Sequence, residues 1–230
     1  MLSIAARPFP FPYNDAFDPQ STALMVIDLQ NDFLSTTGYL ARMGYDLTAL
    51  RAILPVVVDV ISSARKAGIR IIHTRQGVRP DLGDTTPYHR WRRQRHGFDG
   101  TDVFLRGTSG FQTVPEIAIE AGDYVIDKTA NGAFTYTDLD LILRSQRITH
   151  LLFSGCTTEI CVHSTMREAA DRNFQCLLIE DACASGDQYA HDAAVHMTLV
   201  EDGLIGQVAK SRDVIELLDS IASPIYSLTE

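Results

Sequence analysis

The chain has 230 residues, of which 45% are hydrophobic, and its formal net charge is -9. This length is enough for one large domain with a sizeable core. The acidic balance argues against a nucleic acid or an anionic membrane as a partner, because phosphate binding depends on clustered Lys and Arg. No apolar run reaches the roughly 18 residues needed to cross a bilayer, and the N-terminus has no basic start followed by an apolar block. We therefore expect a cytoplasmic protein.

The first predicted elements are short apolar segments that recur along the chain. Most contain β-branched residues, and each is bounded by Gly or polar residues. Near-continuous apolar strands of this kind are typical of a parallel sheet that is buried on both faces. The predicted strands are 23–28 (ALMVID), 69–74 (IRIIHT), 124–127 (YVID), 150–155 (HLLFSG), 176–181 (CLLIED) and 204–209 (LIGQVA).

Segments with helical spacing lie between these strands. Leu, Ile, Val and Ala return at steps of three and four residues in roughly 47–67, 137–146, 159–173, 189–201 and 212–222. The alternation predicts an α/β fold of three layers, with a mostly parallel doubly wound sheet and helices on both faces. Ligands of such folds bind outside the carboxyl ends of the strands. We expect a proline-rich extended arm at 1–20 and a single domain at 21–225.

Residues 75–122 interrupt this rhythm with a Gly-, Pro-, Asp- and Arg-rich insertion that has little periodicity. Such insertions are often lids or binding loops, but a solvated loop or a subunit contact fits equally well. The insertion contains the basic cluster HRWRRQRHG at 89–97. We interpret this cluster first as a solvated, intersubunit or acid-pairing surface. The alternative is a lid whose arginines or Trp91 close a pocket.

Three polar residues stand at predicted strand ends. Asp28 ends the first strand, Lys128 follows YVID, and Cys161 opens the helix after HLLFSG. Each has an ordinary explanation on its own: a turn residue, a solvated lysine and a small buried residue. The carboxyl ends of parallel strands share one edge of the sheet, so the three side chains are predicted to converge.

Their chemistry suits nucleophilic catalysis. A thiol at the start of a helix is stabilised as thiolate by free backbone N–H groups and by a nearby ammonium. A carboxylate can take the thiol proton and deliver it to a leaving amine. Of the seven histidines, only His73 is predicted at the carboxyl end of a strand, and a lone His is not a metal site. The four cysteines form no C-x-x-C pair, which favours reduced core residues over a disulfide framework.

Three motifs resemble the isochorismatase-like cysteine hydrolase family: ALMVIDLQNDFL (23–34), VIDKTANGAF (125–134) and the segment from FSGCTTEICV (153–162) to Ser185. The resemblance covers about residues 20–220 and implies a catalytic triad of Asp28, Lys128 and Cys161. It also implies a cis peptide between Cys156 and Thr157, and an oxyanion hole formed by the backbone N–H groups of Thr157 and Cys161.

Several stretches look closest to biuret-type hydrolases of this family: FPYNDAF (11–17), GYLARMGYDL (38–47), IIHTRQGVRPDLGD (71–84) and RWRRQR (90–95). We therefore expect an amidohydrolase that releases ammonia from a small neutral ureido compound, triuret or biuret, through a thioester. Glu201 takes the place of a family amide side chain and is expected to bind the substrate. Phe33 and Phe134 are candidate pocket walls, although core packing also explains them.

The resemblance leaves other functions open. Ureidoacrylate or another N-carbamoyl acid is a second possible substrate class, and Arg75 or Arg79 would then bind its carboxylate. A third interpretation is a catalytically silent binding protein. Nicotinamidases of the family carry further metal-binding histidines between the first two motifs, where this chain has His73 alone, so we expect neither a metal nor another cofactor. Because family members are commonly oligomers, a homodimer or homotetramer is expected.

Overall fold

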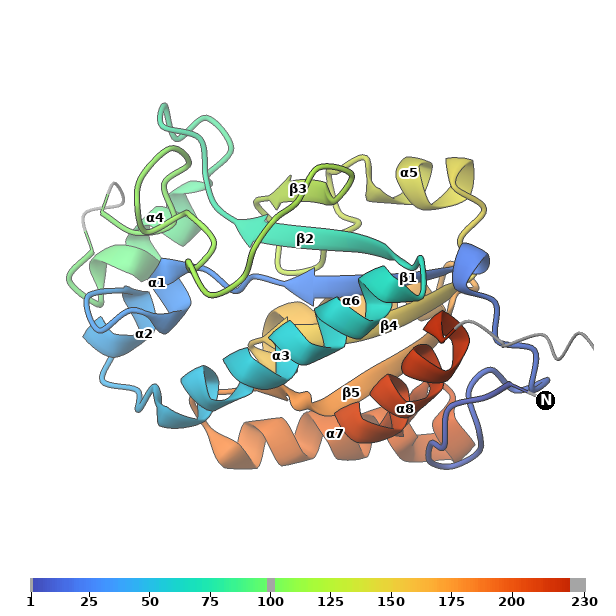
Figure 1. Ribbon diagram of the computed structural model, residues 1–230. Helices are drawn as coiled ribbons and strands as arrows, with labels where there is room; N and C mark the ends of the chain where they lie inside the picture. Colours follow the sequence, from blue (N-terminus) through green and yellow to red (C-terminus); the bar gives the residue numbers. More distant parts are fainter. Residues whose placement is uncertain (1, 99–101, 224–230) are drawn as a thin grey trace, which may run out of the picture.

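A parallel sheet of six strands forms the centre of the molecule in the computed structural model, which describes residues 2–98 and 102–223. The strand order is β3-β2-β1-β4-β5-β6, and each neighbouring pair is parallel. The predicted α/β fold is confirmed (Figure 1). The strands are β1 (Thr22–Ile27), β2 (Arg70–Gln76), β3 (Tyr124–Lys128), β4 (His150–Cys156), β5 (Gln175–Ala184) and β6 (Gln207–Ala209).

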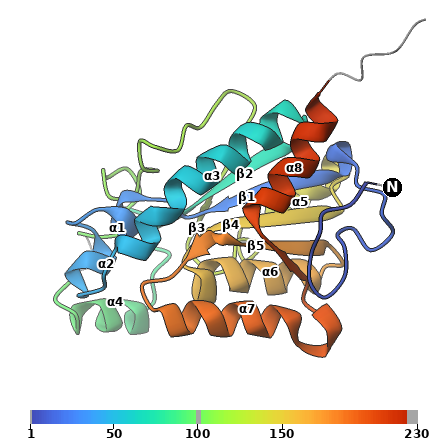
Figure 2. The same ribbon diagram turned by 60° about the horizontal axis from the view of Figure 1, so that its bottom comes forward.

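Helices cover both faces of the sheet, which explains the apolar runs. Along β1, Leu24 and Val26 pack into the cluster that contains α3 and α8, while Met25 and Ile27 face α5, α6 and α7. Figure 2 shows the layers, with α3 and α8 on one side of the sheet and α6 and α7 on the other. The helices are α1 (Asn31–Leu34), α2 (Tyr39–Arg42), α3 (Thr48–Lys66), α4 (Pro87–Gln94), α5 (Leu139–Ser145), α6 (His163–Ala170), α7 (Gln188–Gly203) and α8 (Ser211–Ala222).

Some element bounds differ from those predicted. The segment predicted as one helix at 159–173 begins with a π-helical turn, η2 (Thr158–Val162), and α6 follows it directly. The segment predicted as a strand at 204–209 contributes only β6. The reason is that α7 extends to Gly203. Its backbone leaves helical geometry at Val200, and the positive φ values of Glu201, Asp202 and Gly203 turn the chain back toward the sheet.

The insertion at 75–122 contains a helix and adds side chains to the core on the α3 and α8 face of the sheet. Its middle residues 99–101 lie outside the described part of the chain. Helix α4 lies beside α1 and α2, beyond the carboxyl ends of the strands (Figure 1). The insertion contributes buried apolar side chains from Phe98, Val103, Phe104, Phe111, Val114 and Ile117.

The N-terminal segment packs against the body of the molecule. Ile4 and Phe11 pair by backbone hydrogen bonds and are both fully buried, and Arg7 forms a bridge with Val208 of β6. A 3₁₀ turn, η1 (Pro19–Ser21), leads into β1. The predicted domain end at 225 lies outside the described residues. Within residues 2–98 and 102–223, no helix is long and apolar enough to cross a membrane.

Candidate active site

A buried ion pair joins the ends of two strands. Asp28 follows β1 with a left-handed φ of 50°, and Lys128 is the last residue of β3. Lys128 Nζ lies 2.7 Å from Asp28 Oδ2, and both side chains are fully buried. The hydroxyl of Thr74 donates a 2.6 Å hydrogen bond to the other carboxylate oxygen. The structure therefore brings together two of the three residues that were predicted to converge.

Further acceptors fix the position of the Lys128 ammonium. It donates to Gln76 Oε1 at 2.7 Å and to the carbonyl oxygen of Asn131 at 2.9 Å. Burial alone would lower the pKa of Lys128, but the charge of Asp28 beside it raises that pKa above its ordinary value. Lys128 therefore remains a cation despite its burial.

Cys161 lies in the π-helical turn η2 at the start of the helix that follows β4. Its side chain lies close enough to Asp28 and Lys128 for both to act on its pKa, and it is only 3% exposed. Burial raises the pKa of the Cys161 thiol well above its ordinary value, and the nearby Lys128 ammonium only partly opposes this. The helix start was expected to favour the thiolate, but in this environment the thiol form is the stable one.

Two features hold the segment of Cys161 against the neighbouring elements. Gly155 approaches β1 so closely that an added Cβ would lie 2.1 Å from the carbonyl oxygen of Ile27, which excludes any larger residue. The buried hydroxyl of Thr165 donates to the carbonyl oxygen of Cys161 at 2.7 Å and accepts from the N–H of Ala133 at 3.1 Å. Thr165 thus connects Cys161 to the loop that follows Lys128.

The peptide bond between Cys156 and Thr157 is cis, as the family resemblance implied. Thr157 is the residue that precedes η2, and Thr157 and Cys161 both line one cavity. The oxyanion hole formed by their N–H groups stays a prediction.

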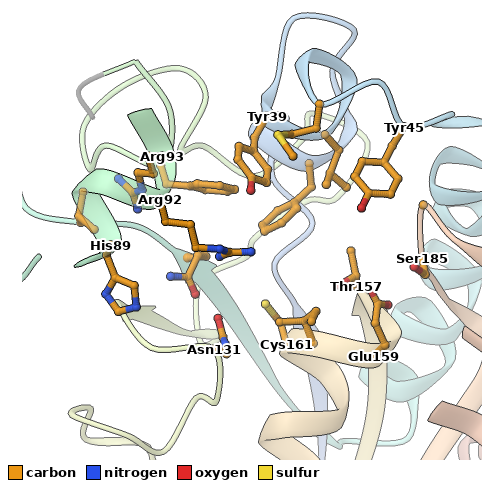
Figure 3. A pocket seen from close by; sticks show the side chains of 18 of the residues that line it. Tyr39, Tyr45, His89, Arg92, Arg93, Asn131, Thr157, Glu159, Cys161 and Ser185 are labelled. Atoms are coloured by element: carbon orange, nitrogen blue, oxygen red, sulfur yellow. The ribbon is translucent and has the colours of Figure 1, made fainter. Parts of the chain in front are cut away.

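This cavity has a volume of about 440 Å³ and opens above Cys161, whose sulfur points into it (Figure 3). Phe33 lines it, as predicted, and packs on Phe104 with ring centroids 4.9 Å apart. Asp28 and Lys128 lie beneath the lining, so Cys161 is the member of the predicted triad that the cavity reaches. The hydroxyl groups of Tyr39 and Tyr45 also point inward (Figure 3).

The cavity has a cationic wall and an acidic wall. His89, Arg92 and Arg93 share one side of α4 through their three- and four-residue spacing, and all three line the cavity. The guanidinium group of Arg92 extends toward the centre (Figure 3). Glu159 lies across the cavity, on the side of Thr157 and Ser185. The basic cluster at 89–97 was interpreted first as a surface feature, but two of its arginines, Arg92 and Arg93, contribute to the cavity wall.

Several predicted contacts lie elsewhere. Glu201 is exposed near the C-terminal end of α7 and is not part of the cavity lining, whereas Ala190 near the start of this helix is. Phe134 is buried in the core against Phe174 and is not part of the lining. The geometry does not support a substrate contact by either residue. Trp91 is 52% exposed and also lies outside the lining.

The two arginines considered for binding a carboxylate are engaged in other pairs. Arg75 forms two hydrogen bonds with Asp127, at 2.7 and 3.1 Å. Arg79 pairs with Asp81 at 2.8 Å on the surface. Neither lines the cavity, so neither provides the carboxylate contact that was considered for it.

Three residues of the first motif have roles that sequence analysis did not assign. Gln30 is fully buried and donates to the carbonyl oxygens of Gln76 and Phe111, and Asn31 donates to that of Ser109. Asp32 accepts from the N–H of Phe104 at 2.7 Å. The motif therefore anchors the insertion that forms much of the cavity wall. A run of polar residues directly after a buried strand was the available signal.

Among residues 2–98 and 102–223, no group of three or more His, Cys, Asp or Glu side chains is arranged to hold a metal ion. His73 lies away from the cavity and pairs with Asp123 at 3.2 Å.

The sheet, the cysteine at the start of a helix and the buried Asp–Lys pair define an isochorismatase-like α/β protein. The family described as Isochorismatase domain matches residues 22–203, and the chain belongs to this family.

Among its relatives is the ureidoacrylate amidohydrolase RutB of Serratia proteamaculans, which is 33% identical over 97% of this chain and 90% of its own length. The N-carbamoylsarcosine amidase of Thermoplasma acidophilum is similar in structure, with a TM-score of 0.64 and 27% identity over 83% of this chain and 96% of its own. A cysteine hydrolase of Pseudomonas syringae has the same fold, with a TM-score of 0.78 and 23% identity over 89% of this chain and 95% of its own. These relatives favour the alternative of an N-carbamoyl amidohydrolase over the expected likeness to biuret hydrolases.

Proposed function

We propose that this protein is a cysteine-dependent amidohydrolase that cleaves the terminal C–N bond of an N-carbamoyl acid, a ureido group attached to a carboxylate-bearing chain. Cys161 in contact with the buried Asp28–Lys128 pair supports the amidohydrolase chemistry. The likeness to a ureidoacrylate amidohydrolase and to an N-carbamoylsarcosine amidase supports the substrate class.

In the proposed acylation, the Cys161 sulfur attacks the carbamoyl carbon while Asp28 accepts the thiol proton. The N–H groups of Thr157 and Cys161 stabilise the oxyanion, and the Lys128 ammonium adds positive charge nearby. Asp28 then gives the proton to the terminal nitrogen, the C–N bond breaks, and ammonia leaves. The rest of the substrate remains attached to the sulfur as a thioester.

In the proposed deacylation, Asp28 takes a proton from water as the water oxygen attacks the thioester carbon. The C–S bond breaks and the proton returns to the sulfur, which regenerates the thiol. The product is a carbamate that loses CO₂ to give the free amine. One water molecule is consumed for each ammonia released.

The position of Arg92 is the observation that carries the choice of substrate. Its guanidinium group projects into the cavity (Figure 3) and forms no ion pair or hydrogen bond with any residue of the described ranges. A substrate carboxylate would form an ion pair with this exposed group, because guanidinium and carboxylate form strong paired hydrogen bonds. Biuret and triuret carry no carboxylate and would form no such pair.

The test compares ammonia release from 3-ureidopropionate, biuret and triuret. We expect the highest kcat/KM with 3-ureidopropionate and no release by Cys161→Ala. For Arg92→Ala, kcat/KM for 3-ureidopropionate is expected to fall roughly 10- to 100-fold, the range for a lost hydrogen bond to a charged group. Biuret turnover should change little.

Arg95→Ala is the matched control, since Arg95 lies over the exposed Trp91 ring and does not line the cavity. A preference for biuret or triuret, or equal effects of the Arg92 and Arg95 variants, would contradict the proposed substrate class. Complete inactivity of the unaltered protein on all three compounds would favour the catalytically silent interpretation.

A further inference from the structure

Glu159 is a carboxylate of the cavity wall that lacks a partner. It stands two residues before Cys161 in η2 and lines the same cavity. Its Oε2 atom is buried without a hydrogen bond, and no Lys, Arg or His of residues 2–98 and 102–223 forms an ion pair with it. Oε2 itself has almost no accessible surface, so a ligand reaches Glu159 where the residue lines the cavity, and there the unpaired carboxylate can accept from donors of the ligand.

The donors that fit this position are N–H groups of the substrate. A carboxylate accepts hydrogen bonds and offers none. A ureido group has N–H on both sides of its carbonyl, whereas a simple carboxamide has N–H on one side only. With the reacting carbonyl at Cys161, an acceptor on the neighbouring wall can therefore distinguish the two by the inner N–H, the one between the carbonyl and the acid chain.

We infer that Glu159 is a specificity-determining residue that accepts a hydrogen bond from the inner ureido N–H of the substrate. This inference rests on the proposed function and adds to it. Arg92 on α4 binds the carboxylate of the substrate, and Glu159 on η2 selects a ureido group over the isosteric carboxamide. The two residues lie on opposite sides of the cavity (Figure 3).

A purely structural role for Glu159 would lead to a different effect of its replacement on activity. An acidic residue in the first turn of a helix stabilises the helix dipole. If this were its whole role, replacing it would lower stability and would reduce activity on all substrates by the same factor. A change in the ratio of the kcat/KM values of two substrates therefore distinguishes substrate recognition by Glu159 from a purely structural role.

The experiment uses a matched pair of compounds, 3-ureidopropionate and glutaramate, in which a CH₂ group replaces the inner N–H. Their kcat/KM values are measured for the unaltered enzyme, Glu159→Gln and Glu159→Ala. We expect the ureido-to-amide ratio to fall roughly 10- to 100-fold in Glu159→Ala, mainly through lost turnover of the ureido compound. Glu159→Gln keeps one acceptor oxygen and is expected to lose less.

Glu216→Ala is the control, because Glu216 is exposed on α8, on the far side of the sheet. Thermal melting of each variant checks that it folds. An unchanged ratio in both Glu159 variants, with 3-ureidopropionate still cleaved, would overturn the role of Glu159 and leave the proposed function intact. If the unaltered enzyme cleaves neither compound, both proposals fall.

One more compound tests another ligand for the same carboxylate. If Glu159 binds an ammonium group, the unaltered enzyme will prefer 4-aminobutanamide to glutaramate and Glu159→Ala will lose that preference. This result would overturn the inference.

Discussion

Removal of one charge from the Asp28–Lys128 pair should destabilise the fold, and the size of the effect follows from the geometry. At 2.7 Å and an effective dielectric constant of about 20, two unit charges attract by about 6 kcal/mol. Asp28→Asn keeps an acceptor oxygen for Thr74 but leaves the buried ammonium without its counter-charge. Lys128→Met leaves the buried carboxylate alone. We expect each change to lower the free energy of unfolding by about 3–5 kcal/mol.

The double variant Asp28→Asn/Lys128→Met gives the sharper result. With both charges gone, neither is left buried and unpaired, so the loss should be well below the sum of the single effects, with a coupling of about 2 kcal/mol or more. The double variant should regain part of the stability that the single variants lose, but it should not regain activity. The double variant lacks both the group that moves the proton and the cation, which together account for at least about 100-fold in rate.

Urea unfolding measures the three free energies, and ammonia release measures the activities. Since domains of this kind are stable by about 5–15 kcal/mol, low temperature keeps the single variants folded. If the double variant loses as much free energy of unfolding as the two single variants together, the coupling of the buried pair is refuted. Activity of Asp28→Asn within tenfold of the unaltered enzyme would refute the acid–base role of Asp28, whatever its effect on stability.

Two further changes test His163 and Thr165. Burial, with Arg167 beside it, lowers the pKa of His163 to about 4, whereas an unfolded His titrates near 6.5. Between pH 6.5 and pH 4 the unfolded chain binds a proton at His163 that the folded chain does not bind. The free energy of unfolding should therefore drop by about 2 kcal/mol over this range. The urea midpoint of His163→Phe should fall less than that of the unaltered protein over the same range. Thr165→Val should reduce kcat more than it changes KM and cost about 1–3 kcal/mol, because the Ala133 N–H loses its acceptor. Thr165→Ser keeps the hydroxyl, and equal behaviour of the Val and Ser variants would exclude the positioning role.

The parallel sheet could be predicted because burial on both faces leaves a strong pattern. Leu24 and Met25 are adjacent in β1 yet pack into different clusters, so every position of the strand must be apolar. The same physics placed Asp28, Lys128 and Cys161 at one edge, since parallel strands end together. Side chains on loops and helix surfaces carry no such pattern.

Helix α4 shows why the cationic wall was not predicted. The helix buries none of its residues, so PYHRWRRQ has no apolar stripe for a periodicity argument to detect. The start of the helix could nevertheless be predicted from the sequence. Thr86 caps the helix by accepting from the N–H of His89, and Pro87 occupies the first turn. A search for caps would have found the helix, but not the cavity that it faces.

Glu201 illustrates a different limit. Its assignment rested on its place in a family motif, and spacing along the chain does not determine which end of a helix meets the cavity. Helix α7 presents Ala190 to the cavity and carries Glu201 away from it. The sequence places Glu159 two residues before Cys161. An acidic residue in a first helical turn is already explained by its interaction with the helix dipole, so sequence analysis gave no reason to single it out.

The complete burial of Asp28 and Lys128 suits the proposed mechanism, in which Cys161 stays protonated until it reacts. Carboxylate, ammonium and thiol together carry no net charge, and transfer of the Cys161 proton to Asp28 leaves a thiolate beside the Lys128 ammonium, again with no net charge. When sulfur attacks, the negative charge moves to the substrate oxygen while the ammonium remains in place. No step of acylation creates an unpaired charge in the buried site, where such a charge would cost several kcal/mol. The high pKa of the thiol is therefore compatible with catalysis, because the proton has to travel only to the neighbouring carboxylate and only while the new bond forms.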